Sequence, residues 1–152
     1  MIRNLLRRCL HLLTYLSGEG SWELRTYESK IIDAVIESLD EDIKPIALSQ
    51  LGGNYFIERI PKGRINVFRF YSKESISKIS DSKFSDLLIN ITINVDGKKE
   101  VAHVTFYKGY FFSIEFKNPG KFYIDKKIET LDVKIGKDNQ SYTVDIDRIE
   151  HQ

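Results

Sequence analysis

The chain has 152 residues, 41% of them hydrophobic and 30% charged, which is enough for one domain with a substantial core. Its formal net charge is only +1, so no global field draws it to a polyanion, and a nucleic-acid role would need a local basic patch. A single cysteine, Cys9, excludes an internal disulfide and a cysteine-based metal site, and favours a reducing compartment. No apolar run reaches the roughly 18 residues that predict a membrane span.

Residues 1–16 predict a basic amphipathic helix that forms a tail on the domain. Arg3, Arg7 and Arg8 lie beside an apolar stripe that includes Leu12, and the segment contains no acid. Such a helix packs on its own domain or on a partner chain, lies on a membrane surface, or is a cleaved export signal. We do not expect an export signal, because the arginines interrupt the apolar stretch and no clean small-residue cleavage motif follows. The other readings stay open.

Residues 17–21, "SGEGS", predict a linker, and residues 22–150 a single domain. Within that domain, apolar residues at helical spacing predict a helix from about Thr26 to Leu39. A second, short helix is expected from near Pro45 to the two glycines at 52 and 53.

Residues 54–71 predict a hairpin of two strands joined by "PKG". Its register stays open, because both faces of each strand carry apolar and charged residues. Arg59, Arg64 and Arg69 are interleaved with aromatic residues, and this composition is typical of binding surfaces. The simpler interpretation, which we favour, is an edge hairpin kept soluble by its charges.

Residues 87–116 predict an antiparallel meander. The odd positions from Leu87 to Val95 are all apolar, so one face of this strand belongs to the core. Asp96-Gly97 is the dipeptide preferred in a two-residue turn, which would place Ile91 opposite Ala102.

The turn before "YFFSIEF" is predicted from register. A two-residue turn at Lys108-Gly109 would bury Glu115 without a partner, which is costly. We therefore predict a three-residue loop over residues 107–109 with a glycine bulge, which leaves Phe111 and Glu115 facing outward. The residues then predicted to face the core are Tyr110, Phe112, Ile114 and Phe116.

The last two strands, "ETLDVKI" and "SYTVDIDRI", alternate apolar and polar residues and are expected to pair across "GKDNQ". In that pairing Leu131, Val133 and Ile135 face Tyr142, Val144 and Ile146. Helices first and strands last predict an α+β domain, with N-terminal helices on one face of a curved antiparallel meander sheet. The layout is similar to cone-shaped cystatin-like folds, a likeness of architecture that carries no function.

Candidate chemistry is sparse. Lys108-Gly109-Tyr110 begins like the RNA-contacting strand of an RNA-recognition fold, but Glu115 would repel phosphate and the flanking pattern departs from the motif, so we expect no nucleic-acid binding. His103 and Glu115 share the polar face of the sheet, where a surface pair is more common than an acid–base pair. We predict no catalytic residue, no metal site and no cofactor, since the three histidines lack ligand spacing.

The stretches "LRTYESKII", "ERIPKGRINVFRFY" and "GYFFSIEF" resemble a group of small bacterial proteins with an L-x-x-W/Y-E helix and a G-x-x-F-S-I-E-F strand. The resemblance covers residues 24–116 and implies a bacterial protein, but it brings no catalytic or binding residues. A small α+β domain without an active-site motif is also similar to immunity proteins of bacterial toxin systems.

The expected function is that of a non-enzymatic protein-binding module, of inhibitor or immunity type, in the cytoplasm or at the membrane periphery. Its partner, another protein, would contact the sheet face around His103, Phe111 and Glu115, or else the arginine hairpin. One alternative is a small-molecule-binding or enzymatic domain with a pocket between helices and sheet, where His103 and Tyr110 are the polar candidates. The other is membrane association through residues 1–16. The oligomeric state does not follow from the sequence.

Overall fold

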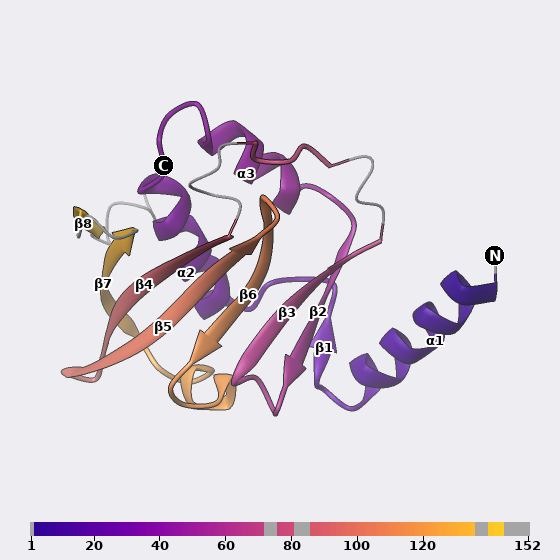
Figure 1. Ribbon diagram of the computed structural model, residues 1–152. Coiled ribbons are helices and arrows are strands. Elements are labelled where there is room, and N and C mark those ends of the chain that lie inside the picture. The colour runs from indigo at the N-terminus through magenta and orange to yellow at the C-terminus, as the bar shows by residue number, and fades with distance from the viewer. Residues whose placement is uncertain (1, 72–75, 81–85, 136–139, 145–152) are drawn as a thin grey trace.

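The structure, a computed structural model, describes residues 2–71, 76–80, 86–135 and 140–144. Within these ranges the chain forms an α+β domain built on one open antiparallel sheet, which confirms the predicted fold class (Figure 1). The helices are α1 (Ile2–Leu16), α2 (Thr26–Glu37), α3 (Lys44–Leu51) and the short 3-10 helix η2 (Gly120–Tyr123). The strands are β1 (Gly20–Ser21), β2 (Tyr55–Ile60), β3 (Ile65–Phe70), β4 (Asp86–Val95), β5 (Lys98–Tyr107), β6 (Tyr110–Phe116), β7 (Ile128–Ile135) and β8 (Gln140–Val144).

The strands lie in the order β1-β2-β3-β6-β5-β4-β7-β8, so the predicted meander forms the centre of the sheet. Helices α2 and α3 cover one face, which we call the core face, and the opposite face is called the outer face (Figure 1). Helix α1 stands apart from them beside β1 and β2. Part of the predicted linker, Gly20–Ser21, is strand β1 and pairs with β2.

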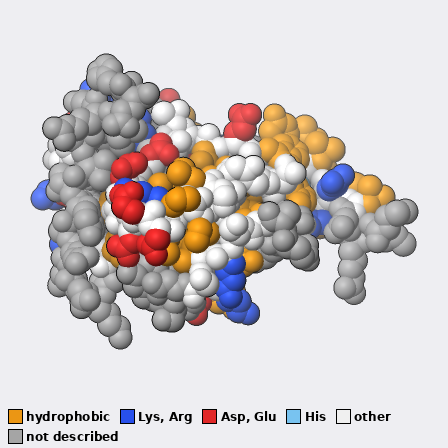
Figure 2. Space-filling model, turned by 90° about the horizontal axis from the view of Figure 1, so that it is seen from above, with side chains coloured by type: hydrophobic (Ala, Val, Ile, Leu, Met, Phe, Trp, Pro, Cys, Tyr) orange, Lys and Arg blue, Asp and Glu red, His pale blue; other side chains and the backbone are white. Residues whose placement is uncertain are grey.

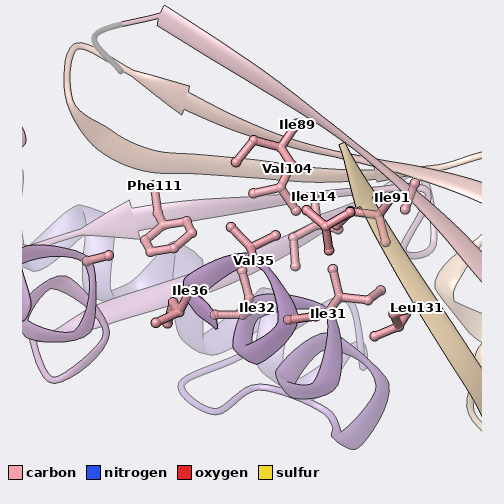
Figure 3. Packing of buried hydrophobic residues seen from close by; sticks show 14 of the residues in the cluster. Ile31, Ile32, Val35, Ile36, Ile89, Ile91, Val104, Phe111, Ile114 and Leu131 are labelled. Carbon is pink, nitrogen blue, oxygen red and sulfur yellow. The ribbon is translucent and has the colours of Figure 1, made fainter. Parts of the chain in front are cut away.

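The core lies between α2 and the central strands. Ile31, Ile32 and Val35 of α2 are fully buried and point toward Ile89 and Val104 of the sheet (Figure 3). They recur at helical spacing on α2, whereas the sheet residues alternate with polar ones, so both elements present an apolar side. Each large side chain buried in this way contributes about 1.5–3 kcal/mol.

The β4–β5 hairpin has the predicted register. Ile91 pairs with Ala102, Ile89 with Val104 and Leu87 with Phe106. Asp96 and Gly97 both have positive φ, 50° and 68°, as the two-residue hairpin turn requires.

The β5–β6 turn differs from the prediction. Lys108 and Gly109 have φ of 54° and 77° and form a two-residue turn, so Phe106 pairs with Phe111. The register then shifts at Phe112, and beyond this bulge Val104 pairs with Ile114. The three-residue loop is therefore wrong. Beyond the bulge, Ile114 and Phe116 face the core as predicted. The bulge therefore allows a two-residue turn and an apolar core face in the same strand.

One of the residues predicted to fill the core, Phe112, exchanges positions with its neighbour Phe111. Phe111 is 2% exposed and packs against Phe106 with ring centres 4.3 Å apart, whereas Phe112 is 39% exposed. Tyr110 is half-buried at the edge of the core, beside Phe70. The prediction that Phe111 faces outward was wrong, because it assumed strict alternation from the turn.

Gln50 of α3 holds the β5–β6 turn in place. Its side-chain amide donates to the carbonyl oxygens of Gly109 and Ser77, both at 2.9 Å, and its Oε1 accepts from the backbone N–H of Phe111 at 2.9 Å. A Cβ at Gly109 would overlap the carbonyl oxygen of Ile79. The turn is thus fixed to α3 by buried hydrogen bonds, which the sequence pattern did not indicate.

The structure also decides the register of the β2–β3 hairpin. Ile57 pairs with Phe68 and Arg59 with Asn66, and all four residues lie on the core face. Strands β7 and β8 pair with each other as expected, with Leu131 opposite Val144 and Val133 opposite Tyr142. The register differs from the prediction, because Ile135 lies opposite Gln140, which was assigned to the connecting loop. Ile146 lies outside the described residues.

Candidate functional site

Helix α1 attaches to the domain through a polar side chain. His11 is only 8% exposed and stacks on Phe56, with the ring centres 4.3 Å apart and the planes 7° apart. Its Nδ1 lies 2.6 Å from the hydroxyl oxygen of Tyr71. Arg7, one turn earlier, donates to the carbonyl oxygen of Phe70 at 3.2 Å and lies over the Tyr71 ring. Since Phe56 precedes the core-facing Ile57, α1 packs on the outer face of the sheet.

The apolar stripe of α1 consequently points away from the domain. A helix turns about 100° per residue, so Leu13 lies about 200° around the axis from His11. We define the leucine face as Leu5, Leu6, Leu10, Leu12, Leu13 and Leu16, which are between 51% and 71% exposed. Figure 2 shows hydrophobic side chains gathered at the end of the molecule where α1 lies. The helix packs on its own domain, as one interpretation predicted, but with the opposite side.

Two aromatic residues extend the leucine face at its C-terminal end. Tyr15 is 49% exposed and Trp22 is 43% exposed, and their ring centres are 5.1 Å apart. Trp22 also meets the ring of Phe56 edge-on, so it is held against the domain on one side. Aromatic residues with one apolar and one polar end are typical of membrane–water interfaces.

The charge of α1 is entirely positive. Arg8 is exposed and lines an open depression of 430 Å³ beside Leu12 and Trp22, at one border of the leucine face. Arg7 belongs to the docking contacts described above, and the side chain of Arg3 lies outside the described residues. The exposed side of α1 therefore combines leucines with arginine charge and carries no acid.

The surroundings of His11 disfavour a positive charge on its ring. Burial lowers the pKa of His11 from 6.5, the nearby charges of Arg7 and Arg69 lower it further, and Glu58 opposes the shift. The docked helix thus favours neutral imidazole. Its stabilising contribution is complete above pH 6.5 and declines as the pH falls below that value toward the lowered pKa.

We expect acidification below pH 6.5 to loosen α1 from the domain. Hydrogen exchange of α1 amides, followed as a function of pH, measures this directly. The matched variant is His11→Phe, which keeps an aromatic ring against Phe56 but cannot titrate, and His103→Gln serves as a histidine control. A pH response of α1 that is the same in His11→Phe as in the parent protein would contradict the assignment.

Arg59 has a structural role, contrary to its prediction as a partner-binding residue. It is 2% exposed and forms two hydrogen bonds of 2.7 Å with the carboxylate of Glu28, which is fully buried in α2. Asn66 donates to the same carboxylate at 2.6 Å, and Ser21 accepts from the guanidinium at 2.9 Å. A side chain enclosed in this network cannot reach a partner. The sequence did not determine the register of the hairpin, so it did not show that the Arg59 side chain points into the core.

Arg64, His103 and Glu115 come together on the outer face. They line an open depression of 680 Å³ that also includes Val101. His103 and Glu115 are opposite residues of β5 and β6, and His103 Nδ1 lies 2.7 Å from Asn90 Oδ1. The structure thus places this histidine and carboxylate directly opposite each other on the polar face that they were predicted to share, although the predicted three-residue loop would have placed His103 opposite Ser113.

The remaining candidates do not join that group. Arg69 forms an ion pair with Glu58 at 2.8 Å on the outer face of β2 and β3. Phe111 is buried and is no longer a candidate. Tyr110 packs near Phe70, whereas His103 lies on the outer face, so these two do not line a common pocket. The space between α2 and the central strands is occupied by the side chains in Figure 3.

The described residues contain no group of three His, Cys, Asp or Glu side chains arranged to hold a metal ion. In the same ranges, no helix has both the length and the hydropathy needed to cross a membrane. Comparison of the chain with protein-family models, curated proteins and solved structures found no match.

Proposed function

We propose that this protein is a non-enzymatic binding module that associates with the surface of an anionic membrane through the leucine face of α1. The observation that carries the proposal is the inverted docking of the helix: His11 is buried against the domain, while six leucines point outward. An apolar face of this size on a helix fixed by its other side supports a binding role.

The positive charge of α1 and the aromatic residues at the end of the leucine face favour lipid as the binding partner. Helices that lie in a membrane interface combine an apolar face with arginine or lysine at its borders, and both features contribute to binding. Arg8 at one border of the leucine face and the absence of any acid in α1 suit a negatively charged surface. Tyr15 and Trp22, at one end of the helix, match the headgroup level of a bilayer.

The expected effects are large enough to measure. A leucine side chain contributes about 1.5–3 kcal/mol when fully buried, so two leucines inserted halfway correspond to roughly a ten- to hundredfold change in partitioning. An arginine near an anionic surface contributes about 1 kcal/mol, or roughly fivefold.

Flotation of the protein with phosphatidylcholine vesicles, with and without phosphatidylglycerol, tests the proposal. We expect the parent protein to float with the anionic vesicles, the double variant Leu6→Ser/Leu13→Ser to lose at least tenfold in partitioning, and Arg8→Gln to lose roughly fivefold. The matched control is Leu48→Ser/Leu88→Ser, which removes two exposed leucines from α3 and β4.

Two results would count against the lipid surface. In one, the leucine-face variant floats as well as the control variant. In the other, the parent protein does not float, but the leucine-face variant changes the sedimentation of the protein in solution. That second result would assign the leucine face to another copy of the chain.

A second candidate function is recognition of a protein partner at the outer-face depression, in keeping with the resemblance to immunity proteins. The observation that favours it is the grouping of Arg64, His103 and Glu115 beside the exposed Val101. Such a mixture of charged and apolar groups suits a protein interface. A defined partner whose binding is lost in Arg64→Ala and Glu115→Ala, and retained in Leu6→Ser/Leu13→Ser, would support this role.

A further inference from the structure

A second surface of the molecule, chemically unlike the leucine face, is rich in positively charged side chains. An open depression of 470 Å³ lies where the start of α2 meets the segment that follows η2. Among the described residues that line it are four cationic side chains, Arg25, Lys30, Lys126 and Lys127, and no acidic one. We call it the basic depression. Its volume is within the range of small-molecule sites, about 300–1,000 Å³.

Tyr123 lines the basic depression and supplies an unused donor. The residue is 1% exposed, and its hydroxyl has no hydrogen-bond partner among the described residues. Burial raises the pKa of Tyr123 to about 12, and the charge of Glu100 and the neighbouring Tyr27 add to the increase. The hydroxyl is therefore protonated at neutral pH. A buried hydroxyl without a partner is uncommon in folded proteins and points to a missing acceptor.

The backbone at this place also favours an anion. Helix α2 begins at Thr26, another lining residue, and the first N–H groups of a helix carry partial positive charge. Glu28, in the first turn, accepts from the backbone N–H of Arg25 at 2.8 Å, but its negative charge is balanced by the buried guanidinium of Arg59. Arg25 is positioned by a hydrogen bond of 3.3 Å to the carbonyl oxygen of Gly18.

Two acidic side chains act against the positive charge. Asp96 forms an ion pair of 2.6 Å with Lys126, so this lysine contributes less than the other cations. Glu100 is not a lining residue, but it interacts electrostatically with Tyr123, and its Oε2 is buried with no hydrogen-bond partner in the part of the chain that the structure describes. Glu100 therefore limits the affinity of the depression for an anion, and neutralising it should increase that affinity.

We propose that the basic depression binds a phosphate group, with Arg25 and Lys127 supplying charge and the Tyr123 hydroxyl donating a hydrogen bond. Apolar lining residues such as Leu24 and Ile128 fit the organic part of a phosphorylated ligand. The phosphate could belong to a small soluble molecule or to a lipid headgroup, and the chemistry recognised is the same. The site does not depend on the leucine face, so the two proposals are tested separately.

Titration with inorganic pyrophosphate, followed by the amide NMR signals of Thr26 and Tyr27, tests the site. We expect saturable shifts of these signals, and roughly tenfold weaker binding in Tyr123→Phe and in Lys127→Gln, since each removes a hydrogen bond or charge contact to an anion. Lys121→Gln, which removes an exposed lysine of η2 outside the depression, should bind as the parent protein does. Glu100→Gln should bind more tightly.

Tyr123→Phe also separates ligand binding from folding. It keeps the ring and removes only an unpartnered hydroxyl, so its thermal stability should equal or exceed that of the parent protein. The lipid source is tested with phosphatidic-acid vesicles in the Leu6→Ser/Leu13→Ser background. If only vesicle binding is weakened by Tyr123→Phe and Lys127→Gln, the phosphate belongs to a lipid headgroup. If pyrophosphate binding is weakened by these substitutions, it belongs to a soluble ligand. Failure of both probes, or equal weakening by Lys121→Gln, overturns the proposal.

Discussion

Replacement of Arg59 by methionine is expected to lower the free energy of unfolding by about 3–5 kcal/mol, because the substitution leaves the carboxylate of Glu28 buried without its counter-charge. Asn66, the Tyr27 hydroxyl and the backbone N–H of Arg25 continue to donate to that carboxylate, but neutral donors do not replace the charge of a guanidinium bonded through two atoms. Urea unfolding measures the loss.

Two further variants make the Arg59 result specific. Arg64→Met removes an exposed arginine of the same hairpin and should change stability by no more than about 0.5 kcal/mol. The double variant Glu28→Leu/Arg59→Met should recover part of the loss, since no buried charge remains. If Arg59→Met is as stable as Arg64→Met, the enclosed ion pair described here is wrong.

Phe111→Ala is expected to lower the free energy of unfolding by about 3–5 kcal/mol, whereas Phe112→Ala should cost about 1 kcal/mol or less. Phe111 is enclosed by Phe106 and Phe68, so its removal leaves a cavity in the core. Phe112 is the bulged residue and lies at the surface beside Tyr107.

This pair of variants tests the register of β6 directly, because the two residues are adjacent and chemically identical. A strand paired through the predicted three-residue loop would give the reverse order, with Phe112→Ala the more damaging change. Urea unfolding of both variants under the same conditions is therefore sufficient. Equal losses would contradict the buried and exposed positions of the two rings.

The central strands were predictable from the sequence because one signal determined each of them. Strict alternation along β4 and the Asp96-Gly97 turn fix the β4–β5 register, since a slip of one residue would expose the core side chains. The same reasoning failed at Lys108-Gly109. There, a two-residue turn followed by strict alternation would have placed Glu115 in the core. The bulge at Phe112 removes this conflict, because it shifts the register of the rest of the strand.

Polar residues in buried positions were the main source of the remaining differences. Arg59 shares a strand with both apolar and charged neighbours, so alternation could not assign its direction. Glu28 offered a usable signal: it lies three and four residues from Ile31 and Ile32, on the side of α2 that faces the core. A carboxylate in that position needs a buried cation, and the arginines of the hairpin were the available partners.

Helix α1 was predicted as an amphipathic helix, but not which side it would bury. The usual expectation is that the apolar stripe packs on the domain. Instead, His11 packs against the rings of Phe56 and Tyr71. These two residues are brought together only by the β2–β3 hairpin. Since neither ring is near His11 in the sequence, this docking could not be read from the helix alone.

The fluorescence of Trp22 offers the most direct measurement of membrane association, because it is the only tryptophan in the chain and lies at the rim of the leucine face. On addition of anionic vesicles, we predict a blue shift of its emission and quenching by lipids brominated in the acyl chains, both absent in Leu6→Ser/Leu13→Ser. Emission that is unchanged by the vesicles, with no quenching by brominated lipid, would contradict the insertion of α1 into a membrane surface.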